Sequence, residues 1–267
     1  MSDEDLWQRL ARLTPARIGL GRVGSGLPTR EVLRFGLAHA QARDAVHTPL
    51  DAQAVADAIA ALGFPTVQAA SSALDRPTYL HRPDYGRRLA PDDRRALAAT
   101  ATETVDLALV VADGLSARAV HEGAAKMLAA LKPYLDKAGW RLAPVVIAVQ
   151  ARVALGDDIG AALKARAVVV MIGERPGLSS PDSLGLYLTF DPKPGRSDAE
   201  RNCISNVRPA GLSFDLAAFK LNWLLTQAFA RGLSGVNLKD ESDHVLDAPQ
   251  TRAAIAPSQT ETPAKPA

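Results

Sequence analysis

The strongest indication of the fold class is the segment Val168-Val169-Val170-Met171-Ile172-Gly173-Glu174-Arg175-Pro176-Gly177-Leu178. Its β-branched first part predicts a short buried strand, and the Gly, Pro and charged residues after it predict a rigid loop. On both sides of this segment, the sequence predicts further strands at residues 107–112, 145–150 and 187–190. Helices are predicted between them at residues 115–137 and 159–164. Strands that alternate with helices indicate an α/β protein whose parallel sheet is doubly wound, that is, Rossmann-like.

The regions on either side of this alternation have a different character. Residues 1–102 predict an N-terminal domain of helices and loops. Thr29 and Asp51 are predicted N-caps of two helices, Pro91 is predicted to open another, and residues 79–88 are predicted to form an ordered loop. Residues 103–240 predict the Rossmann-like domain, whose last long element is an amphipathic helix at residues 214–230. The polar, proline-containing segment 241–267 lacks periodicity and is expected to be disordered.

Composition limits the classes of function. A net charge of +2 is too small to indicate nucleic-acid binding. Cys203 is the single cysteine, which excludes an intramolecular disulfide, and no apolar run approaches the roughly 20 residues that span a bilayer. With an acidic start that lacks the features of a signal peptide, these observations predict a cytoplasmic protein that does not enter the membrane.

One local charge bias stands out, because residues 9–43 contain seven arginines and a single acid, Glu31. Such a run is typical of a solvated basic face. It is also typical of a docking surface, since Arg tolerates burial at interfaces. The residues alone leave both interpretations open.

Common catalytic motifs are absent or weak. Gly19-Leu20-Gly21-Arg22-Val23-Gly24 matches the dinucleotide fingerprint, but no full strand precedes it and Pro28 delays the next helix. The five histidines show no metal-ligand spacing. We find neither a hydrolase nucleophile elbow nor a phosphate-binding P-loop. The sequence therefore predicts no catalytic constellation and no metal site.

Several longer strings resemble one family. They are Ala16-Arg17-Ile18-Gly19-Leu20-Gly21-Arg22, Leu33-Arg34-Phe35, residues 173–178, Arg201-Asn202-Cys203-Ile204-Ser205-Asn206 and Ser234-Gly235-Val236-Asn237. Together they resemble the small subunit of ethanolamine ammonia-lyase over about residues 17–237. The resemblance implies adenosylcobalamin-dependent radical conversion of ethanolamine to acetaldehyde and ammonia. It also implies that cobalamin is held between this chain and a large catalytic subunit, so that the chain is active only as part of a hetero-oligomer.

The resemblance implies that Val153, Glu174 and Cys203 contact cobalamin. Their chemistry suits the edge of a corrin, because Glu174 can accept hydrogen bonds from amide groups and Cys203 is small and weakly hydrated. Asp113, Gly114 and Ser116 follow another strand and could line the same site, although Asp-Gly is also typical of a turn. The alternative interpretations, which involve no cofactor, are a solvated acid for Glu174 and an inert core thiol for Cys203.

Other functions would need features that the sequence lacks. A cobalamin-carrying module of a mutase or methyltransferase would carry an Asp-x-His-x-x-Gly string, which is absent here, so we expect the cofactor to keep its own base on cobalt. A nucleotide-binding module would need a strand before Gly19. A non-catalytic adaptor would use only the basic N-terminal face. Some relatives carry an N-terminal extension that directs packaging into a microcompartment, and we do not expect packaging here.

Overall fold

The computed structural model describes residues 3–14 and 16–246. Its centre is a six-stranded sheet in the order β1-β3-β2-β4-β5-β6. The parallel strands are β1 (Thr66–Ala70), β2 (Val105–Ala112), β3 (Val145–Val149) and β4 (Ala165–Gly173). Two antiparallel strands complete one side, β5 (Leu184–Phe190) and β6 (Arg201–Val207). The expected α/β class with a mostly parallel sheet is therefore confirmed.

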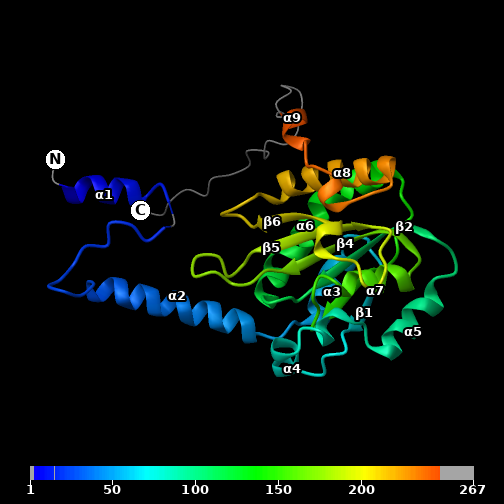
Figure 1. Cartoon of the computed structure of the whole chain (residues 1–267), viewed down its shortest axis with the longest axis horizontal. Coiled ribbons are helices and arrows are strands. Elements are labelled where there is room, and N and C mark those ends of the chain that lie inside the picture. The colour runs from blue at the N-terminus through cyan, green and yellow to red at the C-terminus, as the bar shows by residue number, and fades with distance from the viewer. Residues whose placement is uncertain (1–2, 15, 247–267) are drawn as a thin grey trace.

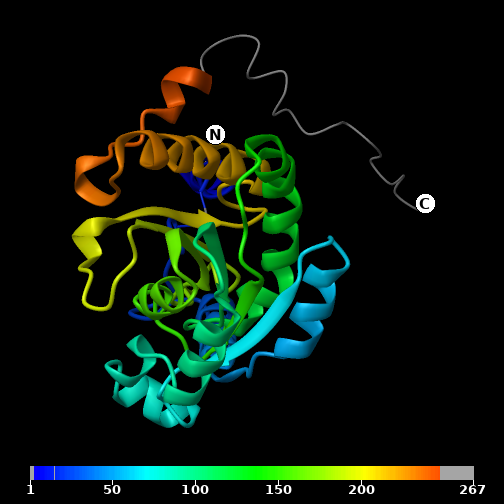
Figure 2. The same cartoon turned by 90° about the vertical axis from the view of Figure 1, so that its right-hand side faces the viewer.

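Helices cover both faces of the sheet, as Figures 1 and 2 show. On one face lie α3 (Ala52–Ala60), α6 (Ala117–Ala138) and α8 (Phe214–Arg231). On the other face lie α5 (Pro91–Thr100) and α7 (Leu155–Ala162). Shorter elements connect them: α4 (Arg76–His81), the 3₁₀ turns η1 (Tyr85–Arg87), η2 (Asp198–Glu200) and η3 (Gly235–Asn237), and α9 (Ser242–Leu246).

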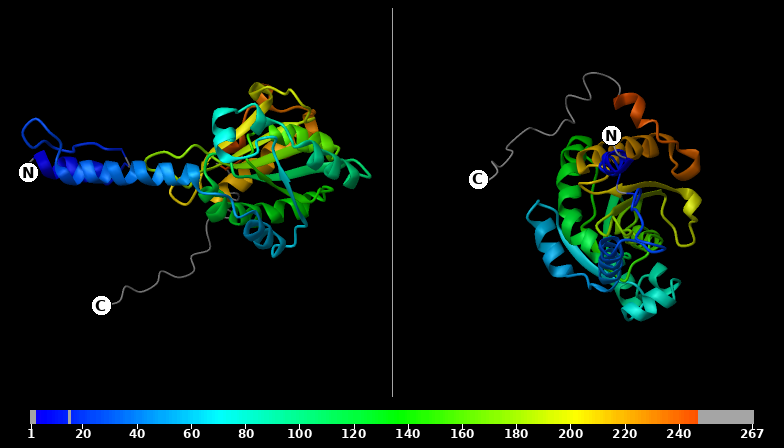
Figure 3. Two further views of the ribbon diagram at one scale, coloured as in Figure 1. Left: turned by 90° about the horizontal axis from the view of Figure 1, so that it is seen from below. Right: turned by 90° about the vertical axis from the view of Figure 1, so that its left-hand side faces the viewer.

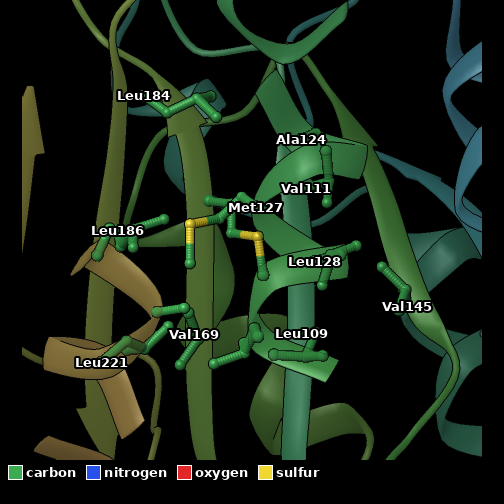
Figure 4. Close-up of a cluster of buried hydrophobic side chains, with 14 of the residues drawn as sticks. Leu109, Val111, Ala124, Met127, Leu128, Val145, Val169, Leu184, Leu186 and Leu221 are labelled. Carbon is green, nitrogen blue, oxygen red and sulfur yellow. The ribbon is translucent and has the colours of Figure 1, made fainter. Parts of the chain in front are cut away.

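Helix α6 shows how the main core is built. Ser116 caps its first turn by accepting a hydrogen bond from the Ala119 amide, and Gly139 ends it in the left-handed region at φ 67°. Between these ends, Met127 and Leu128 point toward the sheet, beside Leu109 and Val111 of β2 in Figure 4. Each of these four side chains is 0% exposed. At about 1.5–3 kcal/mol for a fully buried apolar side chain, this layer is a major source of stability.

Three parts of the secondary structure differ from the sequence prediction. The first hundred residues were expected to hold only helix and loop, yet residues 66–70 form β1 and pair with β3. The segment expected to be a loop, residues 79–88, includes the last turn of α4 and all of η1. Residues 201–207 form an edge strand that was not predicted, and β5 pairs antiparallel with β4. The domain boundary at residue 102 stays a prediction.

The predicted helix starts and the expected tail have mixed outcomes. Asp51 caps α3 through a 2.9 Å hydrogen bond from the Ala54 amide, as expected. Thr29 is instead the first helical residue of α2, with Pro28 at the cap position. Residues 242–246, expected to be disordered, form α9. The rest of the expected tail, 247–267, lies outside the described residues.

An N-terminal arm, defined here as residues 6–14 and 16–47, extends away from the sheet. It contains most of α1 (Asp3–Ala11) and all of α2 (Thr29–His47), and Figures 1 and 3 show α2 projecting from the α/β body. The fingerprint-like segment 19–24 lies in the arm between these helices, and α1 rather than a strand precedes it. This geometry agrees with the weak sequence match. Among the described residues, no helix is long and apolar enough to cross a bilayer.

Candidate functional site

The carboxyl ends of the parallel strands define one edge of the sheet where a ligand can bind. From β2 the chain passes to α6 on one face, and from β3 it passes to α7 on the other face. Neighbouring strands whose connections leave in opposite directions create a crevice, and this is the usual ligand position in open α/β sheets. A cavity of about 360 Å³ lies at this edge.

Asp113, the first residue after β2, ties the ends of β2 and β3 together. It is 3% exposed, and its carboxylate accepts hydrogen bonds at 2.9 Å from the amides of Gln150 and Ala151. Arg76 donates to the same carboxylate at 3.3 Å. Burial raises the pKa of Asp113, while the amide bonds and Arg76 oppose that rise. Gln150 has a φ of 53°, an uncommon conformation that these bonds hold in place.

Tyr79 of α4 supports the loop that follows β3. Its ring is fully buried, and its hydroxyl donates to the Ala151 carbonyl at 3.1 Å. The guanidinium groups of Arg76 and Arg152 lie 4.6 and 4.3 Å from the ring centroid. Gly86 lets the stem of Arg152 approach closely, because a Cβ at Gly86 would lie 2.9 Å from the Arg152 Cγ. These contacts fix the Arg152 side chain before any ligand arrives.

Glu174 begins the loop between β4 and β5. Its carboxylate accepts a 2.5 Å hydrogen bond from the Ser183 hydroxyl and a 3.3 Å bond from the Asn206 amide. Its side chain crosses Gly185, where a Cβ would lie 3.0 Å from the Glu174 Oε1. The absence of a side chain at Gly185 therefore makes room for Glu174.

Cys203 of β6 lies directly opposite Tyr187 of β5. Cys203 is exposed at the surface of β6, so it is not the core thiol of the alternative interpretation. Partial desolvation by its neighbours still raises the pKa of the thiol and the charge of Glu174 adds to the rise, while a hydrogen bond with Tyr187 opposes it. Burial also raises the pKa of Tyr187, with Cys203 and Glu174 contributing in the same direction. Both groups are therefore neutral at pH 7, and they place a thiol and a phenol beside the Glu174 carboxylate.

The cavity is lined by residues from five segments of the chain. They are Tyr79 of α4, Gly114 and Leu115 after β2, Arg152 and Val153 after β3, Ile172 and Gly173 in β4, Glu174 and Arg175 after it, and Tyr187 of β5. The lining thus combines apolar side chains with two guanidinium groups and one carboxylate, which can hold a partly apolar ligand that carries hydrogen-bonding groups.

Comparison with known proteins gives the family. The model of the ethanolamine ammonia-lyase light chain matches residues 4–239 of this chain. The chain belongs to the ethanolamine ammonia-lyase light-chain family. Three curated relatives carry the name ethanolamine ammonia-lyase small subunit. The one from Xanthomonas campestris is 54% identical over 256 residues, which cover 95% of this chain and 94% of the relative. Those from Rhodopseudomonas palustris and Azotobacter vinelandii are each 55% identical, over 87% and 90% of this chain and 89% and 90% of their own lengths.

The structure brings together the three residues that the likeness to this light-chain family singled out. Val153 and Glu174 line the same cavity, and Cys203 is next to Tyr187, which also lines it. Of the strand-end residues proposed beside them, Gly114 lines the cavity, whereas Asp113 is buried behind it. Ser116 instead caps α6, and its hydroxyl donates to the Pro181 carbonyl at 2.6 Å.

Among the lining residues that sequence reasoning missed in this member of the light-chain family, four carry polar or charged groups: Tyr79, Arg152, Arg175 and Tyr187. Arg152 and Arg175 are direct neighbours of the predicted Val153 and Glu174, so their place in the sequence pointed to them. Tyr79 and Tyr187 had no such signal, because only the fold brings α4 and β5 to this edge of the sheet.

Proposed function

We propose that this chain is the small subunit of ethanolamine ammonia-lyase, and that it binds adenosylcobalamin together with a large catalytic subunit. The complex would convert ethanolamine to acetaldehyde and ammonia in the cytoplasm. Besides the family, one observation carries the proposal: Val153 and Glu174 line one strand-end cavity that Cys203 borders through Tyr187. When bound, the cofactor supplies the radical chemistry, and the protein supplies binding, orientation and shielding.

The cavity suits a part of this cofactor. At about 360 Å³ it lies at the lower end of the range for drug-sized ligands, and cobalamin is considerably larger than such ligands. This chain would therefore enclose one portion of cobalamin and leave the rest to the partner subunit. One polar atom of the site supports the binding of a ligand here, because the buried Nε of Arg152 has no acceptor among the residues in the described ranges.

The residues of this chain would bind the cofactor without acting on the substrate. Leu115, Val153 and Ile172 offer apolar contact to the corrin, whose rim carries primary amides. Glu174 would accept hydrogen bonds from those amides, since its carboxylate receives only neutral donors in the free chain. The Asp113 network would keep the loop with Val153 in position. We assign no acid–base residue of this chain to ethanolamine, and we expect the base-on form of the cofactor.

The N-terminal arm supports the proposed docking on the large subunit. Its helix α2 exposes large apolar side chains, with Leu33 67% and Leu37 61% exposed. Arg30 and Arg34 flank them and pair with the buried Glu31. Apolar side chains rimmed by arginine on a projecting helix are typical of a protein–protein interface. Of the two interpretations of the basic run, we therefore propose the docking surface.

Loop 174–183 brings the arm and the cavity close to each other. Glu174 begins this loop and lines the cavity, while Leu178 and Ser179 line a groove together with Arg17 and Arg34 of the arm. A large subunit that binds the arm would thus reach the cofactor site, as expected for a cofactor held between two subunits.

Reconstitution of both subunits tests the proposal. We expect the purified complex to bind cobalamin, seen as corrin absorbance that comigrates with the protein, and to release ammonia from ethanolamine. The small subunit alone should show no turnover. Glu174→Ala should weaken cobalamin binding, whereas Glu103→Ala, which removes a carboxylate 79% exposed and remote from the cavity, should not. A wild-type complex that takes up no cobalamin would end the proposal.

A further inference from the structure

Arg152 has hydrogen-bonding capacity that the free chain does not use. One terminal nitrogen, Nη2, donates to the Tyr79 carbonyl at 3.2 Å. The Nε is buried and lacks an acceptor within residues 3–14 and 16–246. Buried donors are nearly always paired, and an unpaired one is costly, above all on a charged group. An acceptor supplied by a ligand would satisfy this nitrogen.

The charges around the cavity favour an anion. Arg152 and Arg175 both line it, and neither forms an ion pair within the part of the chain that the structure describes. Glu174, the one carboxylate of the lining, already accepts hydrogen bonds from Ser183 and Asn206. The lining therefore carries two positive charges against one negative charge, and its carboxylate does not neutralise either guanidinium.

The Arg152 side chain is also held in place. Its guanidinium lies 4.3 Å from the centroid of the Tyr79 ring, and Gly86 packs against its stem. The backbone amide of Arg152 donates to the Gly86 carbonyl at 2.8 Å, which fixes the start of the side chain. A guanidinium ordered in advance loses little entropy on binding and presents its donors in a planar fork that matches an oxyanion.

We propose that Arg152 binds the phosphodiester in the nucleotide loop of cobalamin. This assignment rests on the proposed function, namely that the cavity receives a part of this cofactor. The phosphodiester is the only oxyanion of cobalamin, because the side chains on the corrin rim are neutral amides. Arg152 would thus hold the nucleotide tail through a charge-assisted hydrogen bond, while Val153 and Glu174 contact the corrin.

A comparison of two corrinoids tests the assignment. Cobinamide lacks the nucleotide and its phosphodiester but keeps the corrin with its amides. Both corrinoids are titrated into the complex of the two subunits, and binding is followed by corrin absorbance. Arg152→Gln should weaken cobalamin binding by about ten- to a hundredfold, as expected for a lost hydrogen bond to a charged group. The same change should leave cobinamide binding unaffected.

Two further variants complete the design. Arg152→Lys keeps the charge without the planar fork and should fall between wild type and Arg152→Gln. Arg118→Gln removes an arginine of α6 that pairs with Glu122 and should change neither titration. Equal weakening of both corrinoids by Arg152→Gln, or unchanged cobalamin affinity, would overturn the assignment and leave the proposed function intact. A wild-type complex that binds neither corrinoid would overturn both.

Discussion

Cys203 of β6 and Tyr187 of β5 face each other across an antiparallel pair, so the only cysteine of the chain borders the strand-end cavity. Because this thiol is unique, its chemistry reports on the site without interference from other thiols. Partial desolvation and the Glu174 charge both raise its pKa, and only the thiolate form reacts with alkylating reagents.

We therefore expect iodoacetamide to alkylate Cys203 of the native chain more slowly at pH 8 than in the same chain unfolded in urea. Glu174→Gln removes a negative charge and should speed the reaction of the native chain. Mass spectrometry across a pH series gives both rates. An apparent pKa of the native thiol at or below that of the unfolded chain would contradict this prediction.

Gly185→Ala should disturb the site more than the fold. The new methyl group would lie 2.9 Å from the Tyr187 Cε2 and 3.0 Å from the Glu174 Oε1, so both side chains must shift. We expect weaker cobalamin binding and a loss of about 1 kcal/mol in the free energy of unfolding, at the low end for overpacking because side-chain ends can move. Gly36→Ala, in α2, meets nothing within 4 Å and should stabilise the helix by up to about 1 kcal/mol. Urea unfolding distinguishes the two changes, and unaltered cobalamin affinity in Gly185→Ala would refute the first.

The ion pair between Arg201 and Asp157 should be the most sensitive polar contact of the fold. Its two hydrogen bonds measure 2.6 and 2.7 Å, and the side chains are 2% and 1% exposed. Arg201→Leu leaves a buried carboxylate without its partner and should cost about 3–5 kcal/mol, part of which Asp157→Leu on the same chain should restore. The exposed pair of Arg118 and Glu122 serves as the control, since Arg118→Leu should cost less than about 1 kcal/mol. Similar losses for the buried and exposed pairs in chemical unfolding would count against this account.

Glu200 should make the stability depend on pH in the acid range. Hydrogen bonds from the Ser197 amide and from Arg196 lower the pKa of Glu200 from 4.5 to about 2. The unfolded chain therefore takes up this proton near pH 4.5 and the folded chain only near pH 2, so the stabilisation present above pH 4.5 is lost as the pH falls toward 2. Wild type should exceed Glu200→Gln in unfolding free energy at pH 6, and the difference should shrink at pH 3. A difference that is constant across this interval would show that the carboxylate is not responsible.

Docking of the arm predicts a selective loss of assembly. Leu33→Asp with Leu37→Asp should weaken binding of the large subunit by more than about tenfold, because each change puts a charge into the proposed apolar contact. The melting temperature of the isolated chain should not change, since both side chains are already exposed in it. Leu74→Asp is the matched control, because Leu74 is 96% exposed but lies outside the arm. Calorimetry gives the affinity for the large subunit. If Leu74→Asp weakened it as much as the double change at Leu33 and Leu37, docking by the arm would lose its support.

Much of the central fold could be predicted because burial gives its strands a clear pattern. Residues 107–112 and 168–172 are continuous apolar runs, as expected for strands covered on both faces. Strands at the sheet edges lack this signal. In β1, Gln68 and two alanines interrupt the β-branched residues, and in β6 the buried face includes Arg201, whose partner Asp157 is distant in sequence.

The direction of β5 was missed for a reason that the sequence does contain. A parallel connection needs a crossover of about a dozen or more residues, usually a helix, and loop 174–183 is too short and contains no helix. An antiparallel hairpin is therefore the simpler prediction after Gly173. At the site, the family strings led to Val153, Glu174 and Cys203, but only the folded chain brings Tyr79 beneath Arg152 and Tyr187 beside Cys203.

Helix α2 leaves a row of leucines and a phenylalanine in water whenever the chain stands alone. A newly synthesised chain would then either self-associate or bind the large subunit, depending on the concentration of large subunit. Balanced synthesis of the two polypeptides would thus be a condition for recovering this one intact, in the cell as in the expression host.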